Sequence, residues 1–410
     1  MKRFVITGAS TYGVKNMGDD AMLASMVQGL KREAPGCQIT FLCRHPDADY
    51  DQAFGFSSLK NMDHDNKEAA AGRIFWGMNA GDPDSHLTAI TEAIRDADLL
   101  IIGGNSFMEI FPNSFLKGVS SYGATLATLA RFLRTPTALY GVNVVDDIKE
   151  TTTQQHAHFM VGSAKAVTMR EESGRQYLAD VGVEGDHITV LGDPAFGMEP
   201  QDCGRTPQEL LAADDIYLSD KPVIGVGFRH EYWMGDEDEY AVINQALADM
   251  LDDIVARFDA QLLFIPNCTY TLAHKWQDDR LTHREIASKM KRRDSVFCVE
   301  QDLTVFETFS LFPLASLHIS NRRHSCIFAA MNDVPFLSIA GVLKGHMPPF
   351  LEELGVPGQI ATVADMEGLA AKIATTWETR EALIAAMRPN VVALATQAKQ
   401  HIPYILGKLQ

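Results

Sequence analysis

Short apolar runs that alternate with segments of helical periodicity constrain the fold of this chain more than any other feature. In residues 315–319 apolar side chains alternate, which predicts a buried strand. A small-residue helix is predicted over residues 325–331 and a second strand over residues 336–339. A strand, a helix and a strand in this order are typical of a βαβ unit with parallel strands.

The same alternation runs through both halves of the chain. Predicted strands lie at residues 4–7, 38–42, 98–102, 137–142, 188–191, 222–229, 261–266 and 296–299. Predicted helices lie at residues 19–33, 85–96, 123–133, 240–258, 278–290, 305–312, 347–353, 366–376 and 379–409. Strands that alternate with helices indicate the α/β class with parallel sheets.

The length of 410 residues exceeds what one hydrophobic core usually serves, so two domains are expected. Residues 197–221 are rich in Pro, Gly, Asp and Gln and lack an apolar period, which places the domain boundary there. We therefore predict two Rossmann-like domains facing a cleft, residues 1–200 and 218–380, followed by a C-terminal helix over residues 381–410. This is a glycosyltransferase-B-like architecture.

Charge and composition exclude several classes of protein. The net charge of −17 argues against binding nucleic acid or an anionic membrane, because those partners need a basic surface. The six cysteines show no C-x-x-C pair and no metal-ligand spacing, so we predict neither a disulfide framework nor a metal site. The sequence starts directly in a strand and has no run of about 18 apolar residues, which predicts a cytoplasmic protein with at most peripheral membrane contact.

An anion site is predicted at the junction between the strand near residue 319 and the following helix. Arg322, Arg323 and His324 form this junction, where the N–H groups and dipole of the helix also favour negative charge. Arg229 ends another predicted strand and would add a second guanidinium. The alternative is that the arginines are solvated loop charges and His324 merely begins a helix.

Two further junctions carry polar or flexible residues. Asn16 and the carboxylates of Asp19 and Asp20 begin the first helix, where they either cap it or point into the cleft. Paired glycines at 103 and 104 end an apolar strand and allow a ligand to approach the backbone, with Asn105 next to them. A third junction, at Arg170 with two following glutamates, is interpreted as a self-neutralising group on the surface.

In their order, these segments resemble the polysaccharide pyruvyl transferases. The family pattern of Arg-x-His, Val-Pro and a downstream Lys has counterparts in Arg322 to His324, in Val334-Pro335 and in Lys344. Further matches are the segments 16–21, 170–173 and 193–196, so the resemblance covers most of the chain. Where Asn105 stands, the family usually has a third glycine.

The resemblance implies transfer of the pyruvyl group of phosphoenolpyruvate onto a saccharide as a ketal, in cell-surface or exopolysaccharide biosynthesis. It implies that the C-terminal domain binds phosphoenolpyruvate and the N-terminal domain the acceptor, either free or lipid-linked, with no other cofactor. His324 would be the general acid and Asp19 or Asp20 the base. The substrate-binding residues would be Arg322, Arg323, Arg229, Lys344, Asn16, Gly103, Gly104 and Asn105.

Two other functions fit the same fold, because a fold does not determine a function. One is a glycosyltransferase that binds the diphosphate of a nucleotide sugar at the same helix N-terminus. The other is a non-catalytic protein that binds an anionic metabolite. The absence of a GxGxxG motif after the first strand and of a Walker lysine loop argues against dinucleotide and ATP binding. The sequence indicates no oligomeric state.

Overall fold

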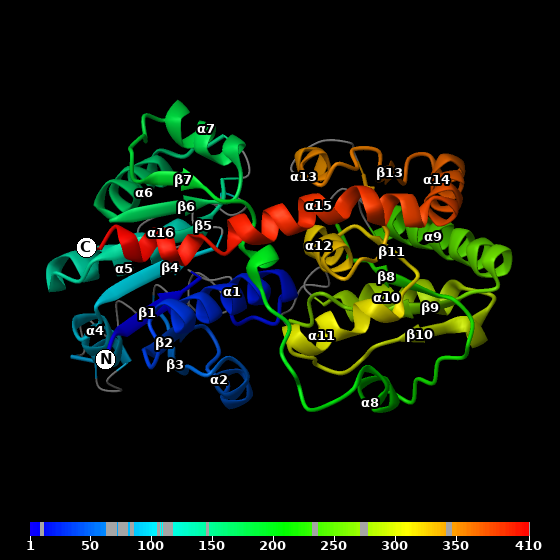
Figure 1. Cartoon of the computed structure of the whole chain (residues 1–410), viewed down its shortest axis with the longest axis horizontal. Coiled ribbons are helices and arrows are strands. Elements are labelled where there is room, and N and C mark those ends of the chain that lie inside the picture. Colours follow the sequence, from blue (N-terminus) through cyan, green and yellow to red (C-terminus); the bar gives the residue numbers. More distant parts are fainter. Residues whose placement is uncertain are drawn as a thin grey trace. The chain divides into compact units, whose positions relative to one another are not determined.

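The computed structural model describes residues 1–8, 12–62, 72, 81–82, 86–104, 107, 109, 118–144, 147–231, 237–270, 278–341 and 347–409. The chain divides into two compact units (Figure 1). Unit 1 comprises Met1–Val14, Asp19–Glu199 and Leu394–Gln410, and unit 2 comprises Lys15–Gly18 and Pro200–Ala393. A short piece of the N-terminal sequence therefore belongs to unit 2, and the C-terminus belongs to unit 1.

Unit 1 contains a seven-stranded parallel sheet in the order β3-β2-β1-β4-β5-β6-β7. Its strands are β1 (Arg3–Thr7), β2 (Gln38–Cys43), β3 (Ser57–Lys60), β4 (Leu99–Gly103), β5 (Thr137–Val142), β6 (Ala166–Met169) and β7 (Ile188–Val190). The central strands β4 and β5 are buried along their whole length, which explains their continuous apolar sequences.

Helices in unit 1 connect successive strands. They are α1 (Met17–Glu33), α2 (Ala48–Phe54), α4 (His86–Arg95), α5 (Val119–Leu133), α6 (Thr151–Ser163) and α7 (Glu172–Asp180), and the short 3-10 helix η1 (Pro194–Gly197) follows the last strand. Helix α16 (His401–Gly407) returns to this unit and contacts β5 and β6 (Figure 1). The first two residues of α1 belong to unit 2.

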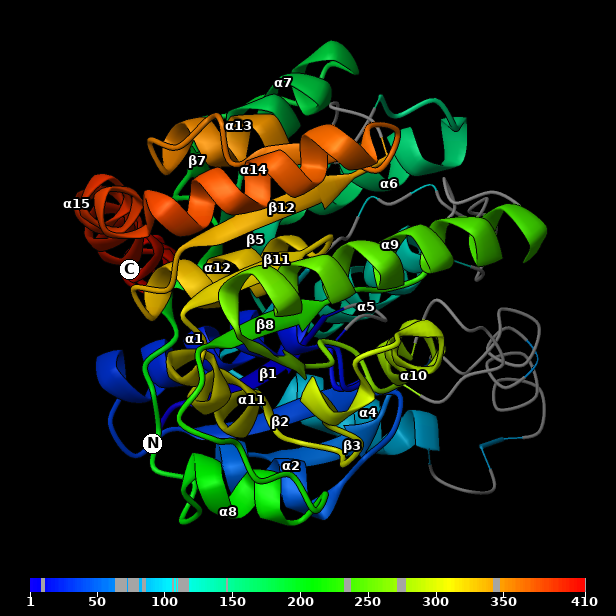
Figure 2. The ribbon, with the colours of Figure 1, turned by 90° about the vertical axis from the view of Figure 1, so that its right-hand side faces the viewer.

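Unit 2 contains a six-stranded parallel sheet in the order β10-β9-β8-β11-β12-β13. Its strands are β8 (Val223–Gly227), β9 (Gln261–Phe264), β10 (Val296–Cys298), β11 (Leu317–Ser320), β12 (Phe336–Ala340) and β13 (Ile360–Thr362). Its helices are α8 (Pro207–Ala212), α9 (Glu237–Phe258), α10 (Asp279–Lys289), α11 (Val305–Leu311), α12 (Arg323–Met331), α13 (Met347–Glu353) and α14 (Met366–Glu378), with 3-10 turns η4 (Arg293–Ser295) and η5 (Phe312–Leu314). Helices α9 and α14 lie side by side (Figure 2).

The predicted α/β class with two parallel sheets is confirmed, and so is the βαβ unit formed by β11, α12 and β12. The edge strands β3 and β13 were not predicted, because they are short and only partly buried and so lack a clear apolar pattern. The predicted helix over residues 379–409 is wrong in detail, since it forms α15 (Arg380–Ala398) and α16. Pro403 has no N–H to bond the carbonyl of Lys399, which explains the break.

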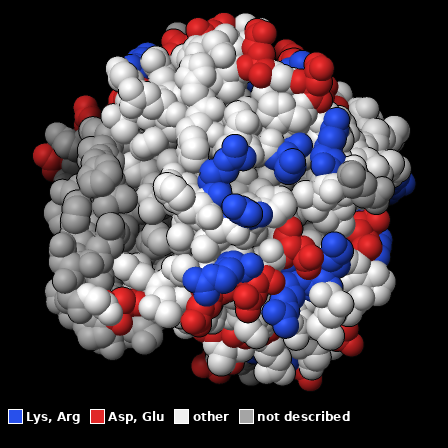
Figure 3. Space-filling model, turned by 90° about the vertical axis from the view of Figure 1, so that its left-hand side faces the viewer, with Lys and Arg blue, Asp and Glu red and all other residues white. Residues whose placement is uncertain are grey.

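The cysteines, the hydropathy of the helices and the surface charges relate to properties that the sequence predicted. All six cysteines are free thiols that are buried or partly buried. Within the described residues no helix is both long and apolar enough to cross a membrane. Figure 3 shows one face of the molecule, on which basic, acidic and uncharged side chains are intermixed.

Candidate functional site

Three strands of unit 2 bring polar residues to the carboxyl edge of its sheet. Strand β8 leads to Arg229, β9 leads to Asn267, and β11 leads to Arg322. Strand β8 lies between β9 and β11, so the three carboxyl ends are neighbours. Ligands of open parallel α/β sheets bind at this edge, which makes it the candidate site of unit 2.

Arg322 is the N-cap residue of α12, and its guanidinium is almost fully buried against the carboxylate of Asp279. Nη2 of Arg322 donates a short hydrogen bond to Oδ1 of Asp279. Burial by itself would lower the pKa of Arg322, but the combined effects of Asp279, Cys268 and Glu231, of which Asp279 contributes most, outweigh burial and raise it. The arginine therefore stays charged, and it has a carboxylate partner that the sequence did not indicate.

Arg229 also has a carboxylate partner. Its Nε and Nη2 donate to the two oxygens of Glu231 over 2.5 and 2.8 Å. The backbone N–H of Arg229 donates to Oδ1 of Asn321, whose Nδ2 donates back to the Arg229 carbonyl at 2.9 Å. These paired bonds hold the ends of β8 and β11 together, so Arg229 has a structural role in addition to any role in binding.

The first turn of α12 is fixed by a buried polar network. The hydroxyl of Ser325 lies 2.6 Å from Nε2 of His318 and accepts a hydrogen bond from Nδ2 of Asn267 at 3.1 Å. Burial lowers the pKa of His318 to about 3, so its imidazole is neutral at physiological pH. Arg323 turns toward α13, where its guanidinium carbon lies 5.0 Å from the centre of the Phe350 ring.

His324 lies against the segment Lys15–Gly18 within unit 2. A Cβ on Gly18 would come within 2.1 Å of Nδ1 of His324, so only glycine leaves room for the imidazole. Asn16 forms an antiparallel bridge with Cys268, and its Oδ1 accepts the Gly18 N–H at 3.3 Å. The N–H of Met17 donates to the Asn267 carbonyl at 2.8 Å. This segment is therefore part of the candidate site.

The two candidate bases lie in unit 1 and differ in their surroundings. Asp20 is fully buried and accepts hydrogen bonds from the Tyr50 hydroxyl at 2.5 Å and from the Gly13 N–H at 3.4 Å. Asp19 is 6% exposed and contributes to raising the pKa of Tyr12, for which burial is the main cause. The bonds of Asp20 favour a structural role, so Asp19 is the better candidate of the two.

The prediction that Arg170 belongs to a surface charge group is wrong. Arg170 is 5% exposed, and its Nη1 lies 3.6 Å from Oδ2 of the buried Asp193. The two residues follow the neighbouring strands β6 and β7. A buried arginine requires a carboxylate partner such as Asp193, which is distant in sequence. The adjacent Glu171 and Glu172 suggested a local surface pair instead, and this led to the wrong prediction.

The glycines at the end of β4 lie under the side chain of Tyr12. A Cβ on Gly103 would come within 2.7 Å of the Tyr12 hydroxyl, and Gly104 has a φ of +76°. The close approach explains the small residue at 103, and the positive φ explains the glycine at 104. In unit 1 the space next to Gly103 is thus occupied by a protein side chain.

Five of the predicted residues lie in unit 2, in segments that follow its strands or pair with them. These are Asn16, Arg229, Arg322, Arg323 and His324. Asp19, Asp20, Gly103 and Gly104 lie in unit 1. Asn105 and Lys344 lie outside the described residues.

Sequence reasoning missed the residues that support Arg229, Arg322 and α12. These are Asp279, Asn267, Ser325, His318 and Glu231. Applying the strand-end rule to β9 would have indicated Asn267. The pairing of Asp279 with Arg322 joins positions 43 residues apart, and no local pattern could have revealed it.

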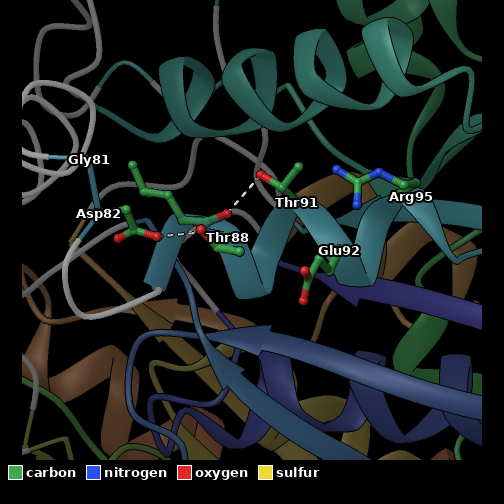
Figure 4. A pocket seen from close by; sticks show the side chains of 7 residues that line it. Gly81, Asp82, Thr88, Thr91, Glu92 and Arg95 are labelled. Carbon is green, nitrogen blue, oxygen red and sulfur yellow. Dashed lines mark hydrogen bonds between the residues drawn. The ribbon is translucent and has the colours of Figure 1, made fainter.

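A separate surface pocket of about 370 Å³ runs along α4 (Figure 4). Asp82 lies at one end and accepts the Thr88 N–H at 2.7 Å, which helps to cap the helix. None of the predicted site residues lines this pocket. Among the described residues there is also no cluster of three or more His, Cys, Asp or Glu that could hold a metal ion.

Solved structures with a similar fold include UDP-GlcNAc 2-epimerases and a glycosyltransferase. UDP-GlcNAc 2-epimerase from Neisseria meningitidis, bound to UDP-GlcNAc, is 10% identical with a TM-score of 0.63, covering 99% of this chain and 100% of that one. The Methanocaldococcus jannaschii UDP-GlcNAc 2-epimerase is 13% identical with a TM-score of 0.60, covering 91% and 92%. A glycosyltransferase from Rickettsia africae is 13% identical with a TM-score of 0.60, covering 99% of both. These similarities establish the glycosyltransferase-B-like fold alone.

The sequence itself identifies the family. No curated protein matches this sequence. The model of the family described as polysaccharide pyruvyl transferase, however, matches residues 16–341. This range includes Arg322 and all of the segment Lys15–Gly18 except its first residue. Because this match spans most of the 410 residues, the chain belongs to the polysaccharide pyruvyl transferase family.

Proposed function

We propose that the protein transfers the pyruvyl group of phosphoenolpyruvate to a saccharide and forms a ketal. Membership of the family supports this reaction class. The observation that carries the proposal is the strand-to-helix junction of unit 2, where a buried, charged Arg322 and the imidazole of His324 flank the start of α12. We place the reaction in the cytoplasm, where phosphoenolpyruvate is made.

Phosphoenolpyruvate carries a carboxylate and a phosphate, and a guanidinium fork matches either group. Arg322 uses Nη2 for Asp279, and its Nε makes no hydrogen bond with the residues that the structure describes. The N-terminus of α12 adds backbone N–H groups and the positive end of the helix dipole. These features support an anion site at Arg322 despite the net charge of −17.

The chemistry requires a proton donor and two attacking hydroxyls. His324 protonates the methylene carbon of the donor, which leaves an oxocarbenium-like centre at the carbon that carries the phosphate. One saccharide hydroxyl attacks this carbon and gives its proton to a base, for which Asp19 is the candidate. Phosphate then leaves with the proton that the base had accepted, and the second hydroxyl attacks the same carbon and gives its proton back to His324, which closes the ketal. No step requires a cofactor in addition to the donor substrate, phosphoenolpyruvate.

The alternative is a glycosyltransferase that places a nucleotide diphosphate at the same helix. The solved structures with this fold include proteins bound to UDP-GlcNAc, but at 10% identity they are similar in fold only. The two functions differ in the donor, so a donor assay separates them.

The test uses phosphoenolpyruvate labelled in its pyruvyl carbons, a panel of free and lipid-linked saccharides, and the full-length protein. We expect label in the saccharide and an equal amount of released phosphate, both dependent on the acceptor and both unchanged by a chelator. His324→Ala is the matched inactive control. Transfer that required a nucleotide sugar instead of phosphoenolpyruvate would contradict the proposal.

A further inference from the structure

A single buried carboxylate joins three segments around Arg322. Asp279 is the first residue of α10 and is 1% exposed. Its Oδ2 accepts the backbone N–H groups of Asn267 at 2.9 Å and Cys268 at 3.0 Å. Its Oδ1 accepts the hydrogen bond from Arg322. The end of β9, the start of α10 and the junction between β11 and α12 therefore meet at one side chain.

Only a carboxylate satisfies this arrangement. The three groups that bond the Asp279 carboxylate among the described residues are all donors, and they approach both of its oxygens. An asparagine has one oxygen and an NH2 group, so in either orientation its NH2 would face a donor. Loss of the charge would also remove the charge-assisted bond to Arg322.

The same contacts leave Arg322 able to bind an anion. The negative charge of Asp279 is shared with two backbone N–H groups and with the N-terminus of α10. Arg322 gives Asp279 one of its five N–H donors, and its buried Nε has no partner among the described residues. Asp279 thus anchors one nitrogen of the guanidinium without occupying all of its donors.

We propose that Asp279 is a positioning residue for the donor, which orients Arg322 so that its remaining N–H groups face an anionic group of phosphoenolpyruvate. This inference rests on the proposed function. A long arginine side chain has many rotamers, and a partner that selects one of them reduces the ordering needed when the anion binds. The effect of Asp279 on the donor should therefore pass through Arg322.

The test is a double-mutant cycle with Asp279→Asn and Arg322→Ala, measured on the KM for phosphoenolpyruvate and on kcat. We expect Asp279→Asn alone to raise the KM by roughly ten- to a hundredfold and to change kcat by less than about threefold, because misorientation affects binding first. In the Arg322→Ala protein, the same substitution should leave the KM unchanged. Asp278→Asn is the matched control, because Asp278 precedes Asp279 and its carboxylate pairs with Arg280 instead.

The outcomes separate this inference from the proposed function. If wild-type protein uses phosphoenolpyruvate but Asp279→Asn raises the KM equally with and without Arg322, Asp279 acts on the fold and the inference is wrong. A lower KM in Asp279→Asn would also overturn it, since Asp279 would then only neutralise Arg322. If the wild type does not use phosphoenolpyruvate, the proposed function fails first.

A second variant covers the case in which Asp279→Asn does not fold. Arg322→Lys keeps a positive charge beside Asp279 but loses the guanidinium fork. We expect a KM for phosphoenolpyruvate raised by about tenfold or more, with little change in the melting temperature. An unchanged KM in Arg322→Lys would show that the orientation of the fork does not matter and would overturn the inference.

Discussion

Replacement of Gly18 by alanine tests whether the position of the His324 imidazole controls the reaction. The new Cβ would lie 2.1 Å from Nδ1 and 2.4 Å from Cγ of His324, whereas ordinary contacts begin at 3.4 Å. The ring must therefore move by about 1.3 Å, the difference between the Nδ1 distance and an ordinary contact. A displacement of about 1 Å at a reacting group can cost a factor of about 100 in rate.

We therefore expect Gly18→Ala to lower kcat about a hundredfold, equivalent to about 2.7 kcal/mol of transition-state stabilisation. Gly18 is the second residue of α1 and has no positive φ, so alanine itself suits its backbone. The melting temperature should change little. The assay is phosphate release at saturating phosphoenolpyruvate and saccharide, with thermal unfolding of the same samples.

Gly162→Ala is the matched control. Gly162 lies within α6, and a Cβ there would meet no heavy atom within 4 Å among the described residues. This variant should gain up to about 1 kcal/mol of stability and keep its turnover. In the His324→Ala protein, Gly18→Ala should have no further effect on kcat. A Gly18→Ala protein with wild-type turnover would refute the role of this contact.

Three further predictions concern single side chains. His324→Gln can still form hydrogen bonds but cannot deliver a proton, so turnover should fall by a factor of about 10²–10⁴. The affinity for phosphoenolpyruvate should change by less than about tenfold. If only the affinity fell, His324 would be a ligand of the donor and not the proton donor. Asp193→Ala removes a buried carboxylate partner of the buried Arg170 and should cost about 3–5 kcal/mol in urea unfolding; a cost below about 1 kcal/mol would contradict this. Burial lowers the pKa of His401 from 6.5 to about 4 in the folded protein. As the pH falls from 6.5 to 4, His401 therefore binds a proton in the unfolded chain but not in the folded one, and the folded state loses stability. His401→Gln, which can still donate to the Gly192 carbonyl, should reduce this pH dependence by about 1.4 kcal/mol per pH unit, and an unchanged slope would exclude His401 as its source.

Local patterns predicted the elements of the fold but not their buried pairs. The βαβ unit around Arg322 was predictable because apolar alternation and a small-residue helix are local features. The partner of Arg322 was not, because Asp279 lies 43 residues away in the sequence and reaches Arg322 only through the arrangement of the strands. Arg170 shows the same limit, since its partner Asp193 follows a different strand. The role of Gly18 depends on a contact with His324, which lies more than 300 residues away in sequence.

Equilibrium binding of phosphoenolpyruvate tests the central claim most directly, because it requires no knowledge of the acceptor. Isothermal titration of the full-length protein with phosphoenolpyruvate should show one site per chain. Arg322→Ala should weaken this binding by about 2–5 kcal/mol, as expected when one side of a buried, hydrogen-bonded charge pair is removed. Saturable binding of UDP-GlcNAc, with no binding of phosphoenolpyruvate, would contradict the account.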